Sequence, residues 1–354
     1  MIPSLENSWL WGLVGDDAAA ALWSPDRQVQ AMLRFEAALT RAMGTAGLAE
    51  PDACKAVAAQ IESFQPDMAA ITAATGTDGL PVPALIRQLR DAVGADKALV
   101  HTGATSQDVL DTATVLILRD VSDLITDRLI EIASQLDALD QAFGPAPMMG
   151  RTRMQAALEM KVSDRIAPWW IAIEDHIAAL KDLRPSVERL QLGGAVGNRA
   201  AFGDAADALA AAMAQELELG NPERAWHVNR APIVAYGNQM ALISGSLGKI
   251  GQDIALMTQQ GIDAMTVAGG GGSSAMPHKQ NPILAELLVT LARFNAGQAG
   301  LLQQVMVHEQ ERSGSAWTLE WLVLPQICMA TARATGATVT LLSQVTSIGD
   351  GKGG

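Results

Sequence analysis

Aromatic residues are scarce in this sequence. They make up 4% of its 354 residues, with one tyrosine, five phenylalanines and eight tryptophans, whereas alanine, leucine, methionine and glutamine are plentiful. This composition favours helices and is poor in the residues that fill β-sheets. Because apolar residues still reach 49%, the chain can bury a sizeable core. We therefore predict an all-α protein.

Net positive charge is also lacking, since the formal net charge is −13. Binding to nucleic acids derives much of its affinity from Lys and Arg that neutralise phosphates, and adhesion to anionic membranes needs a basic surface. The acidic balance argues against both partners. A small anionic ligand stays compatible with this charge if it meets a locally positive site.

Patterns that bind metals or form disulfides are missing. The two cysteines, Cys54 and Cys328, show no CxxC spacing, which favours unpaired thiols in a reducing compartment. The five histidines form no HxxxH or HExxH pairing with carboxylates. We therefore expect neither a metal site nor a cofactor.

Targeting and membrane segments are not evident either. Residues 1–15 lack the basic region that opens a signal peptide. The most apolar long stretch, residues 231–248, is interrupted by Asn238, Gln239 and two serines, which is typical of a buried bundle helix. We expect a cytoplasmic protein with no membrane partner.

The distribution of Pro and Gly divides the chain into parts. Ser24-Pro25-Asp26 predicts a helix start, with a helix that runs to about residue 47. Shorter helical segments separated by Pro and Gly follow, and they complete a small N-terminal helical domain, residues 1–97. The expected short helices lie around residues 52–63, 67–75 and 82–93.

Long segments with little Pro or Gly come next. Residues 106–143 contain neither and would form a helix about 55 Å long. Helices of this length need each other's apolar faces, so we predict a central long-helix bundle over residues 98–345 that can continue across subunits. Residues 346–354 are expected to form a disordered tail. The other long helices are expected in residues 231–263, 282–310 and 317–345.

The most unusual segment is AGGGGSSAMPHKQNP, residues 268–282. Four consecutive glycines cost conformational entropy, which indicates a loop that moves or brings its backbone close to a ligand. Hydroxyls, a cation and an amide follow, beside the start of a helix, where they suit a carboxylate or a developing anion. A flexible Gly-Ser linker is the alternative. A phosphate loop is disfavoured because the GxxxxGK[ST] order is absent.

Two segments carry a resemblance to a known family. Residues 272–282 read GSSAMPHKQNP and resemble the GSSxMPxKxNP signature of the fumarase/aspartase superfamily at every fixed position. Residues 101–113 read HTGATSQDVLDTA and resemble the HxGxTSxDxxDTA segment of its adenylosuccinate-lyase-like branch. The chain is therefore identified as a member of this superfamily over roughly residues 1–345.

Three further segments resemble the carboxymuconate cycloisomerases of that superfamily. They are QLGGAVG at residues 191–197, residues 222–230 with Trp226, His227 and Arg230, and residues 309–325 with a Glu-Arg pair and two tryptophans. The resemblance implies an intramolecular lyase that interconverts 3-carboxy-cis,cis-muconate, a small tricarboxylate, and 4-carboxymuconolactone in the protocatechuate branch of the β-ketoadipate pathway. An aci-carboxylate dianion is the implied intermediate.

A third superfamily block departs from the common pattern. Residues 150–156 read GRTRMQA and align with GRTHxQxA, but Arg153 stands where most relatives carry a catalytic His. An amine or hydroxide leaving group needs a general acid, whereas a carboxylate is ionised at neutral pH and needs none. Arg153 could instead bind a substrate carboxylate through its planar guanidinium, with an ion pair at the surface or an interface as the alternative.

The motif positions imply residue roles. Ser273 would carry the proton, assisted by Lys279, and Lys279 and Asn281 would hold the activated carboxylate. His101 would either act in catalysis or only orient the ligand or cap the following helix. Substrate contacts are implied for Thr105, Ser106, Arg151, Thr152, Arg153, Gln155, Ser274, Met276, Asn281 and Arg312.

Other titratable residues have less defined roles. His278 could contact solvent as easily as substrate, and Glu286 could be structural because the His with which it would pair is missing. The three remaining histidines are expected on helix faces or at interfaces: His176, His227 and His308.

The resemblance also implies a homotetramer in which each active site takes the three blocks from three subunits. Superfamily chains often continue into a small C-terminal helical domain, which we expect to be absent or truncated here. Two alternatives stay open. One is an adenylosuccinate lyase-like β-elimination enzyme, which would need a His at position 153, and the other is a non-catalytic bundle protein of the same fold.

Overall fold

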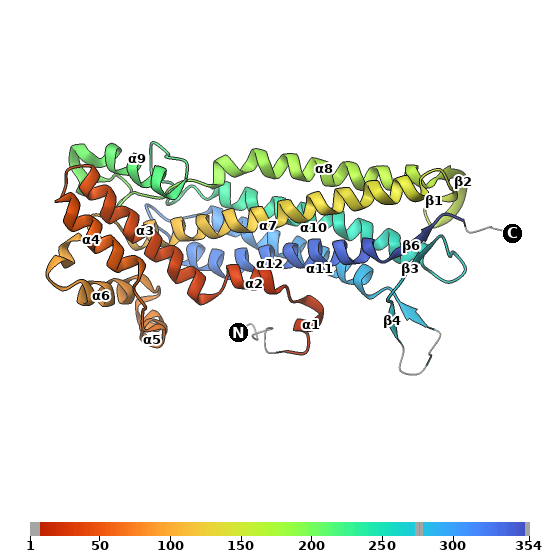
Figure 1. The fold of residues 1–354 in the computed structure, drawn as a ribbon, viewed down its shortest axis with the longest axis horizontal. Coiled ribbons are helices and arrows are strands. Elements are labelled where there is room, and N and C mark those ends of the chain that lie inside the picture. The colour runs from red at the N-terminus through yellow and green to blue at the C-terminus, as the bar shows by residue number, and fades with distance from the viewer. Residues whose placement is uncertain (1–7, 273–275, 277–278, 351–354) are drawn as a thin grey trace.

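Long helices that run side by side form most of the molecule. The computed structural model describes residues 8–272, 276 and 279–350. Its bundle consists of α7 (Ser106–Phe143), α8 (Val162–Val187), α10 (Ala231–Met257), α11 (Ile283–Leu302) and α12 (Ser315–Ser343) (Figure 1). Helices α7, α10 and α12 start at one end of the bundle, whereas α8 and α11 start at the other. The predicted all-α fold is confirmed.

Helix α7 determines the length of the bundle. It contains 38 residues, so at 1.5 Å per residue it is about 55 Å long. Its inward face buries Leu116, Ile125, Leu129 and Ile132, and no Pro or Gly interrupts it. The predicted bounds of this helix, residues 106–143, are confirmed.

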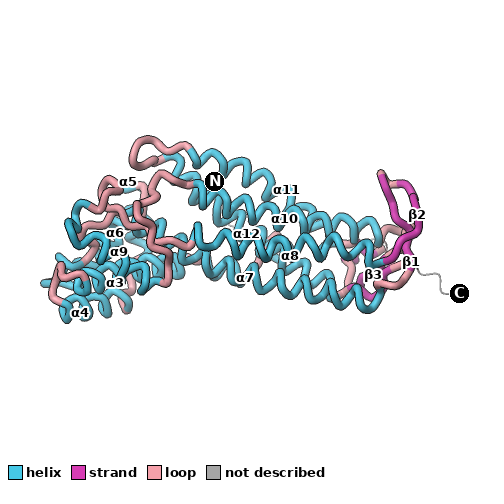
Figure 2. The backbone as a smooth tube through the Cα atoms, turned by 90° about the horizontal axis from the view of Figure 1, so that it is seen from above, coloured by secondary structure: helices cyan, strands magenta, loops and turns pink. Residues whose placement is uncertain are grey.

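Shorter helices cover the end at which α7 starts (Figures 1 and 2). Helix α3 (Pro25–Thr45) begins as predicted after Ser24, whose Oγ accepts a hydrogen bond from the Arg27 amide, and it packs along α7. Helix α9 (Ala206–Leu217) packs against α3, so residues from both predicted domains meet here. The domain boundary at residues 97 and 98 stays a prediction. The remaining helices are α1 (Trp11–Val14), α2 (Asp17–Leu22), α4 (Pro51–Glu62), α5 (Met68–Asp78), α6 (Val82–Val93), η2 (Gly94–Leu99), η3 (Ala200–Ala205) and η4 (Gln303–Met306).

Three short antiparallel strand pairs lie at the opposite end (Figure 1). They are β1 (Pro147–Thr152) with β2 (Gln155–Lys161), β3 (Met265–Val267) with β6 (Val345–Ile348), and β4 (Gly271–Gly272) with β5 (Gln280–Asn281). Strand β6 corrects one prediction, because residues 346–348 were expected in a disordered tail. Their pairing with β3 satisfies backbone groups that a free tail would leave to water. Residues 351–354 of the predicted tail lie outside the described part.

Two helices are shorter than predicted. Helix α10 ends at Met257 instead of residue 263, where Gly261 and Asp263 adopt positive φ angles of 86° and 47° that no helix accepts. Helix α11 ends at Leu302 and continues only as the short η4, instead of reaching residue 310. Helices α8 and α9 were not predicted. Pro168 lies inside α8, and a proline in a sequence usually indicates the end of a helix.

The interior of the bundle contains hydrogen-bonded polar groups beside its apolar core. Asn295 on α11 donates hydrogen bonds to Ser244 Oγ on α10 (2.8 Å) and Thr331 Oγ1 on α12 (2.9 Å). These bonds tie three helices at one level. No helix in the described ranges is both long and apolar enough to cross a membrane.

Candidate active site

The start of α7 is organised around a buried carboxylate. Asp108 is fully buried and accepts hydrogen bonds from the Thr105 amide (3.0 Å), the Gly193 and Gly194 amides (2.8 Å each) and His227 Nε2 (2.7 Å). One side chain thus joins the superfamily block at residues 101–113, which we call the first block, to the glycine-containing segment 191–197 and to the segment that carries His227. Because hydrogen bonds to charged groups are strong, these loops are held rigidly.

Arg312 lies against the same helix start. Its Nε donates to Gln107 Oε1 (3.0 Å), and one terminal nitrogen lies 3.3 Å from the Ala195 carbonyl oxygen. Gln107 in turn donates to the His227 carbonyl (2.9 Å). Arg312 itself is exposed, so its cationic group stays accessible beside the amino-terminal end of α7. A helix start and a guanidinium together favour an anion.

His101 lies in the loop between η2 and α7, five residues before Ser106, in a strained conformation. Its φ angle is 59°, which is unusual for a residue other than glycine. Its Nδ1 lies 2.6 Å from Oε1 of Glu36, a fully buried residue of α3. Burial opposes the charged form, but the charge and hydrogen bond of Glu36 outweigh it, so the pKa of His101 is raised.

A buried ion-pair network stabilises the end of the bundle where α7 starts. Arg230 is 1% exposed and its guanidinium contacts Asp111 and Glu320, with N–O distances of 2.7 and 2.5 Å. Trp317 Nε1 donates to Asp111 Oδ1 (3.0 Å). The two carboxylates raise the pKa of Arg230 although burial opposes its charge. The residues of this network come from α7, α12 and the loop before α10, so it fixes their relative positions.

The superfamily block at residues 150–156 forms the tip of the β1–β2 hairpin at the other end. Arg153 and Met154 have positive φ angles of 49° and 68°, as in the two-residue turns that connect such strands. Residues 151–159 are all exposed. Within the described ranges, the side chains of Arg151, Thr152, Arg153 and Gln155 make no hydrogen bond or ion pair with the rest of the chain. In the part of one chain that the structure describes, no polar partner therefore holds these side chains.

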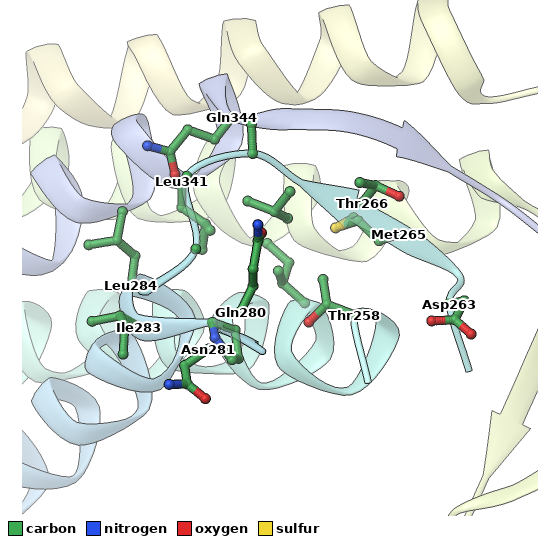
Figure 3. A pocket seen from close by; sticks show the side chains of 16 residues that line it. Thr258, Asp263, Met265, Thr266, Gln280, Asn281, Ile283, Leu284, Leu341 and Gln344 are labelled. Atoms are coloured by element: carbon green, nitrogen blue, oxygen red, sulfur yellow. The ribbon is translucent and has the colours of Figure 1, made fainter. Parts of the chain in front are cut away.

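The described residues of the glycine-rich block, which we call the signature loop (residues 268–282), lie at the same end. A cavity of about 230 Å³ at its base is lined by Gly269, Gly270, Gln280, Asn281 and Gln344, among others, and Figure 3 shows the Gln280 side chain extending into it. Lys279 and Met276 are exposed. The predicted residues Ser273, Ser274 and His278 lie outside the described residues.

The glycines of the signature loop have a packing role. A Cβ on Gly270 would lie 2.9 Å from Gln280 Cβ, and one on Gly271 would lie 2.5 Å from Ile283 Cγ1. Gly269 has a φ angle of 77°, which disfavours any side chain. These glycines therefore allow the loop backbone to lie close to β5 and the start of α11.

The predicted site residues consequently fall into two groups. The helix-start group comprises His101, Thr105, Ser106 and Arg312. The far-end group comprises Arg151, Thr152, Arg153, Gln155, Met276, Lys279 and Asn281. The 38-residue α7 separates them, a distance of about 55 Å. One chain therefore does not bring the two groups into one site.

Other titratable residues lie close to the two groups in the sequence or elsewhere on the bundle helices. Glu286 is in the first turn of α11. His176 pairs with Ser246 Oγ (2.8 Å), and burial lowers its pKa. Burial, with the charge of Arg230, also lowers the pKa of His308. Among the described residues, no cluster of His, Cys, Asp and Glu has the geometry of a metal site.

Several structurally important residues were not selected from the sequence. Glu36 gave no signal there, because it lies in an ordinary amphipathic helix far from any motif. Gln107 and Asp108 lie inside the first block, and Arg230 lies inside the cycloisomerase-like segment, but neither motif shows which partner each side chain meets. His227, expected on a helix face or at an interface, is instead buried against Asp108 in a loop.

Comparisons with known proteins agree with this architecture. A family model described as lyase matches residues 10–296. A 3-carboxy-cis,cis-muconate cycloisomerase of Pseudomonas putida is 37% identical over 318 residues, which cover 88% of this chain and 75% of that relative. A nitrosuccinate lyase of Streptomyces davaonensis is 34% identical over 89% of this chain and 70% of its own length.

Solved structures give the same result. The crystal structure of 3-carboxy-cis,cis-muconate lactonizing enzyme from Pseudomonas putida superposes with a TM-score of 0.88 at 35% identity, and the match covers 96% of this chain and 77% of that one. The family match spans most of the sequence, and the fold agrees over nearly all of it. The chain therefore belongs to the lyase family of the fumarase/aspartase superfamily.

Proposed function

We propose that this protein is a cycloisomerase that interconverts 3-carboxy-cis,cis-muconate and 4-carboxymuconolactone. The observation that carries the proposal is Arg153, which occupies the place of the usual acid–base His in a chain that is 37% identical to a named cycloisomerase. The group that adds to the double bond is the substrate's own carboxylate. It is ionised at neutral pH, so the reaction needs no side chain to protonate a leaving group.

In the lactonising direction the chemistry begins with carboxylate attack. An oxygen of one substrate carboxylate forms a C–O bond to a carbon of the double bond, and the π electrons move onto the neighbouring carbon and the carboxylate attached to it. The resulting aci-carboxylate dianion then accepts a proton at that carbon from the hydroxyl of Ser273. The reverse direction uses the Ser273 alkoxide as the base.

The helix-start group would bind the remaining carboxylates. Thr105 and Ser106 lie where α7 begins, and the accessible guanidinium of Arg312 lies beside them, held by Gln107. Backbone amides at a helix start and a nearby cation stabilise anions. His101 adds a second positive charge to this region when it is protonated.

The far-end group would act on the carbon that receives the proton. Lys279 and Asn281 would stabilise the charge of the dianion, while Arg151, Thr152, Arg153 and Gln155 would contact its carboxylates. Ser274 and Met276 complete the proposed contacts. Fixed charges around a developing anion act most strongly when water is excluded, which requires the exposed hairpin to be covered.

A homotetramer would bring the two groups together. Large apolar side chains stay exposed on the bundle, among them Trp170 and Ile171 on α8, Leu242 on α10 and Phe294 on α11. Such a surface is typical of an interface between copies of a chain. Two neighbouring subunits would supply the rest of the site, one its hairpin and the other its signature loop, at the α7 start of the first chain. We further propose that the enzyme works in the cytoplasm.

The direct test is an assay of the purified protein with 3-carboxy-cis,cis-muconate. We expect the absorbance of the conjugated diene to decay, and Ser273→Ala to abolish the decay while the protein stays folded. Full activity of Ser273→Ala would remove the proton-carrier role and leave the substrate assignment intact. A wild-type protein that ignores this substrate would refute the proposed function.

A second candidate is a lyase that releases another stable anion. The argument from Arg153 holds for any leaving group that needs no acid, and a nitrosuccinate lyase is 34% identical to this chain. Incubation with nitrosuccinate, followed by quantification of the remaining nitrosuccinate, separates the two, because only a lyase of this kind would consume it. Adenylosuccinate cleavage needs protonation of an amine, so Arg153 disfavours it.

A further inference from the structure

Helix α3 buries a carboxylate where apolar side chains would be expected. Glu36 is fully buried, as are its neighbours Phe35 and Leu39. Its Oε1 lies 2.6 Å from His101 Nδ1, and its Oε2 has no hydrogen-bond partner within the described part of the chain. An ionised carboxylate in such a place is costly unless a cation accompanies it. A protonated His101 would therefore offset the cost of burying the Glu36 carboxylate.

The backbone of the loop that carries His101 is also strained, which holds the ring in place. His101 has a φ angle of 59°, and Gly103 has one of 79° with its backbone against the Phe202 ring. The Thr102 hydroxyl donates to the Ala98 carbonyl (2.5 Å). Strained backbone of this kind persists only where surrounding contacts require it, and it is common at functional sites. With Nδ1 bound to Glu36, Nε2 is the ring nitrogen left for a ligand, and the side chain is 14% exposed.

We propose that Glu36 is a positioning residue that holds His101 as an imidazolium, whose Nε2–H binds a substrate carboxylate at the start of α7. This inference rests on the function proposed above, because it needs an anionic substrate beside Thr105 and Ser106. It also decides between the two roles that the sequence left open for His101, since a cation locked by a buried carboxylate binds an anion and does not donate its proton readily.

The charges that face His101 determine its pH dependence. Glu36 on α3 and Asp108 on α7 favour the imidazolium, whereas Arg90 on α6, which also donates to the Val100 carbonyl (3.1 Å), opposes it. Burial opposes it most, yet the pKa of His101 is raised. A raised pKa keeps the ring charged to a higher pH, so the binding of substrate is lost as pH rises through that pKa.

The experiment combines NMR and kinetics on the full-length protein. With ¹³Cε1-labelled histidine, five resonances are expected for the five histidines, and the one lost in His101→Gln identifies His101. We expect Glu36→Gln to lower the pKa of His101 by about one unit or more. The alkaline limb of kcat/KM should move to lower pH by the same amount, mainly through KM, and Glu36→Asp should restore part of the shift.

Thr40→Val is the matched control, because Thr40 is buried one turn further along α3 and bonds the Leu99 carbonyl. It should lower stability without moving the pH profile. An unchanged His101 titration in Glu36→Gln, or a shifted titration with an unchanged kinetic limb, would overturn the proposal. If Glu36→Gln does not fold, the wild-type titration of His101 must coincide with the kinetic limb. A failure of the proposed function shows separately, as a wild type without turnover.

Discussion

At the end of the bundle where α7 begins, the Asp108 and Arg230 side chains are buried and bonded to their neighbours, whereas at the opposite end the polar side chains of the hairpin are exposed. Asp108 alone joins three segments of the chain, and Arg230 joins two carboxylates beneath it. The hairpin from residue 151 to 159 is exposed throughout. Under the function proposed above, the chain would preorganise one half of the site and present the other half outward.

The comparison predicts a large loss of stability for removal of an arginine at the α7 start and almost none for removal of an arginine at the far end. Arg230→Ala would leave Asp111 and Glu320 as buried, uncompensated charges and should reduce the free energy of unfolding by about 3–5 kcal/mol. Arg153→Ala, in the exposed hairpin, should change it by less than about 0.5 kcal/mol. Urea denaturation at one fixed protein concentration measures both. Equal losses would show that the hairpin is as integrated as the α7 start.

For catalysis we expect the exposed far end to matter although it contributes little to stability. Lys279→Ala removes an exposed cation, so we expect kcat to fall by about 10²–10³-fold while the free energy of unfolding stays nearly unchanged. Lys55→Ala is a suitable control, because Lys55 is also exposed but belongs to α4, away from both groups. A similar kcat for both variants would exclude Lys279 from the chemistry.

Glycines provide a smaller contrast between the two ends. Gly103→Ala would force a side chain onto a φ angle of 79°, with its Cβ 2.5 Å from the Phe202 ring, and should cost about 1–3 kcal/mol of stability. Gly272→Ala meets no described atom within 4 Å and should cost less than about 0.5 kcal/mol. Thermal denaturation of both variants decides this. A larger loss for Gly272→Ala would indicate that the signature loop is packed in solution.

The fold was largely predictable because its strongest signals are local. The absence of Pro and Gly between residues 106 and 143 gave α7 with its observed bounds, and the Ser24 cap gave the start of α3. Helix α8 was missed because Pro168 looks like a break, although the surrounding contacts keep the helix continuous. The β1–β2 hairpin was missed because Arg153 and Met154 are not typical turn residues for positive φ angles.

Sequence motifs predicted the polar residues of the candidate site but not the partners of these residues. The blocks around residues 101, 150 and 272 indicated the polar residues, and their separation along α7 follows from helix length. The partners of these residues were not predictable, because Glu36, Gly193 and Arg312 meet the first block through long-range packing that no local pattern records.

Complementation between two variants tests most directly whether the two ends form one site across subunits. Ser106→Ala and Lys279→Ala, each impaired alone, are co-expressed with different tags, and mixed oligomers are isolated through both tags. We predict that these regain a measurable part of the wild-type turnover of 3-carboxy-cis,cis-muconate, because some sites then combine an intact α7 start with an intact signature loop. Mixed oligomers no more active than the two separate variants would contradict a site shared between chains.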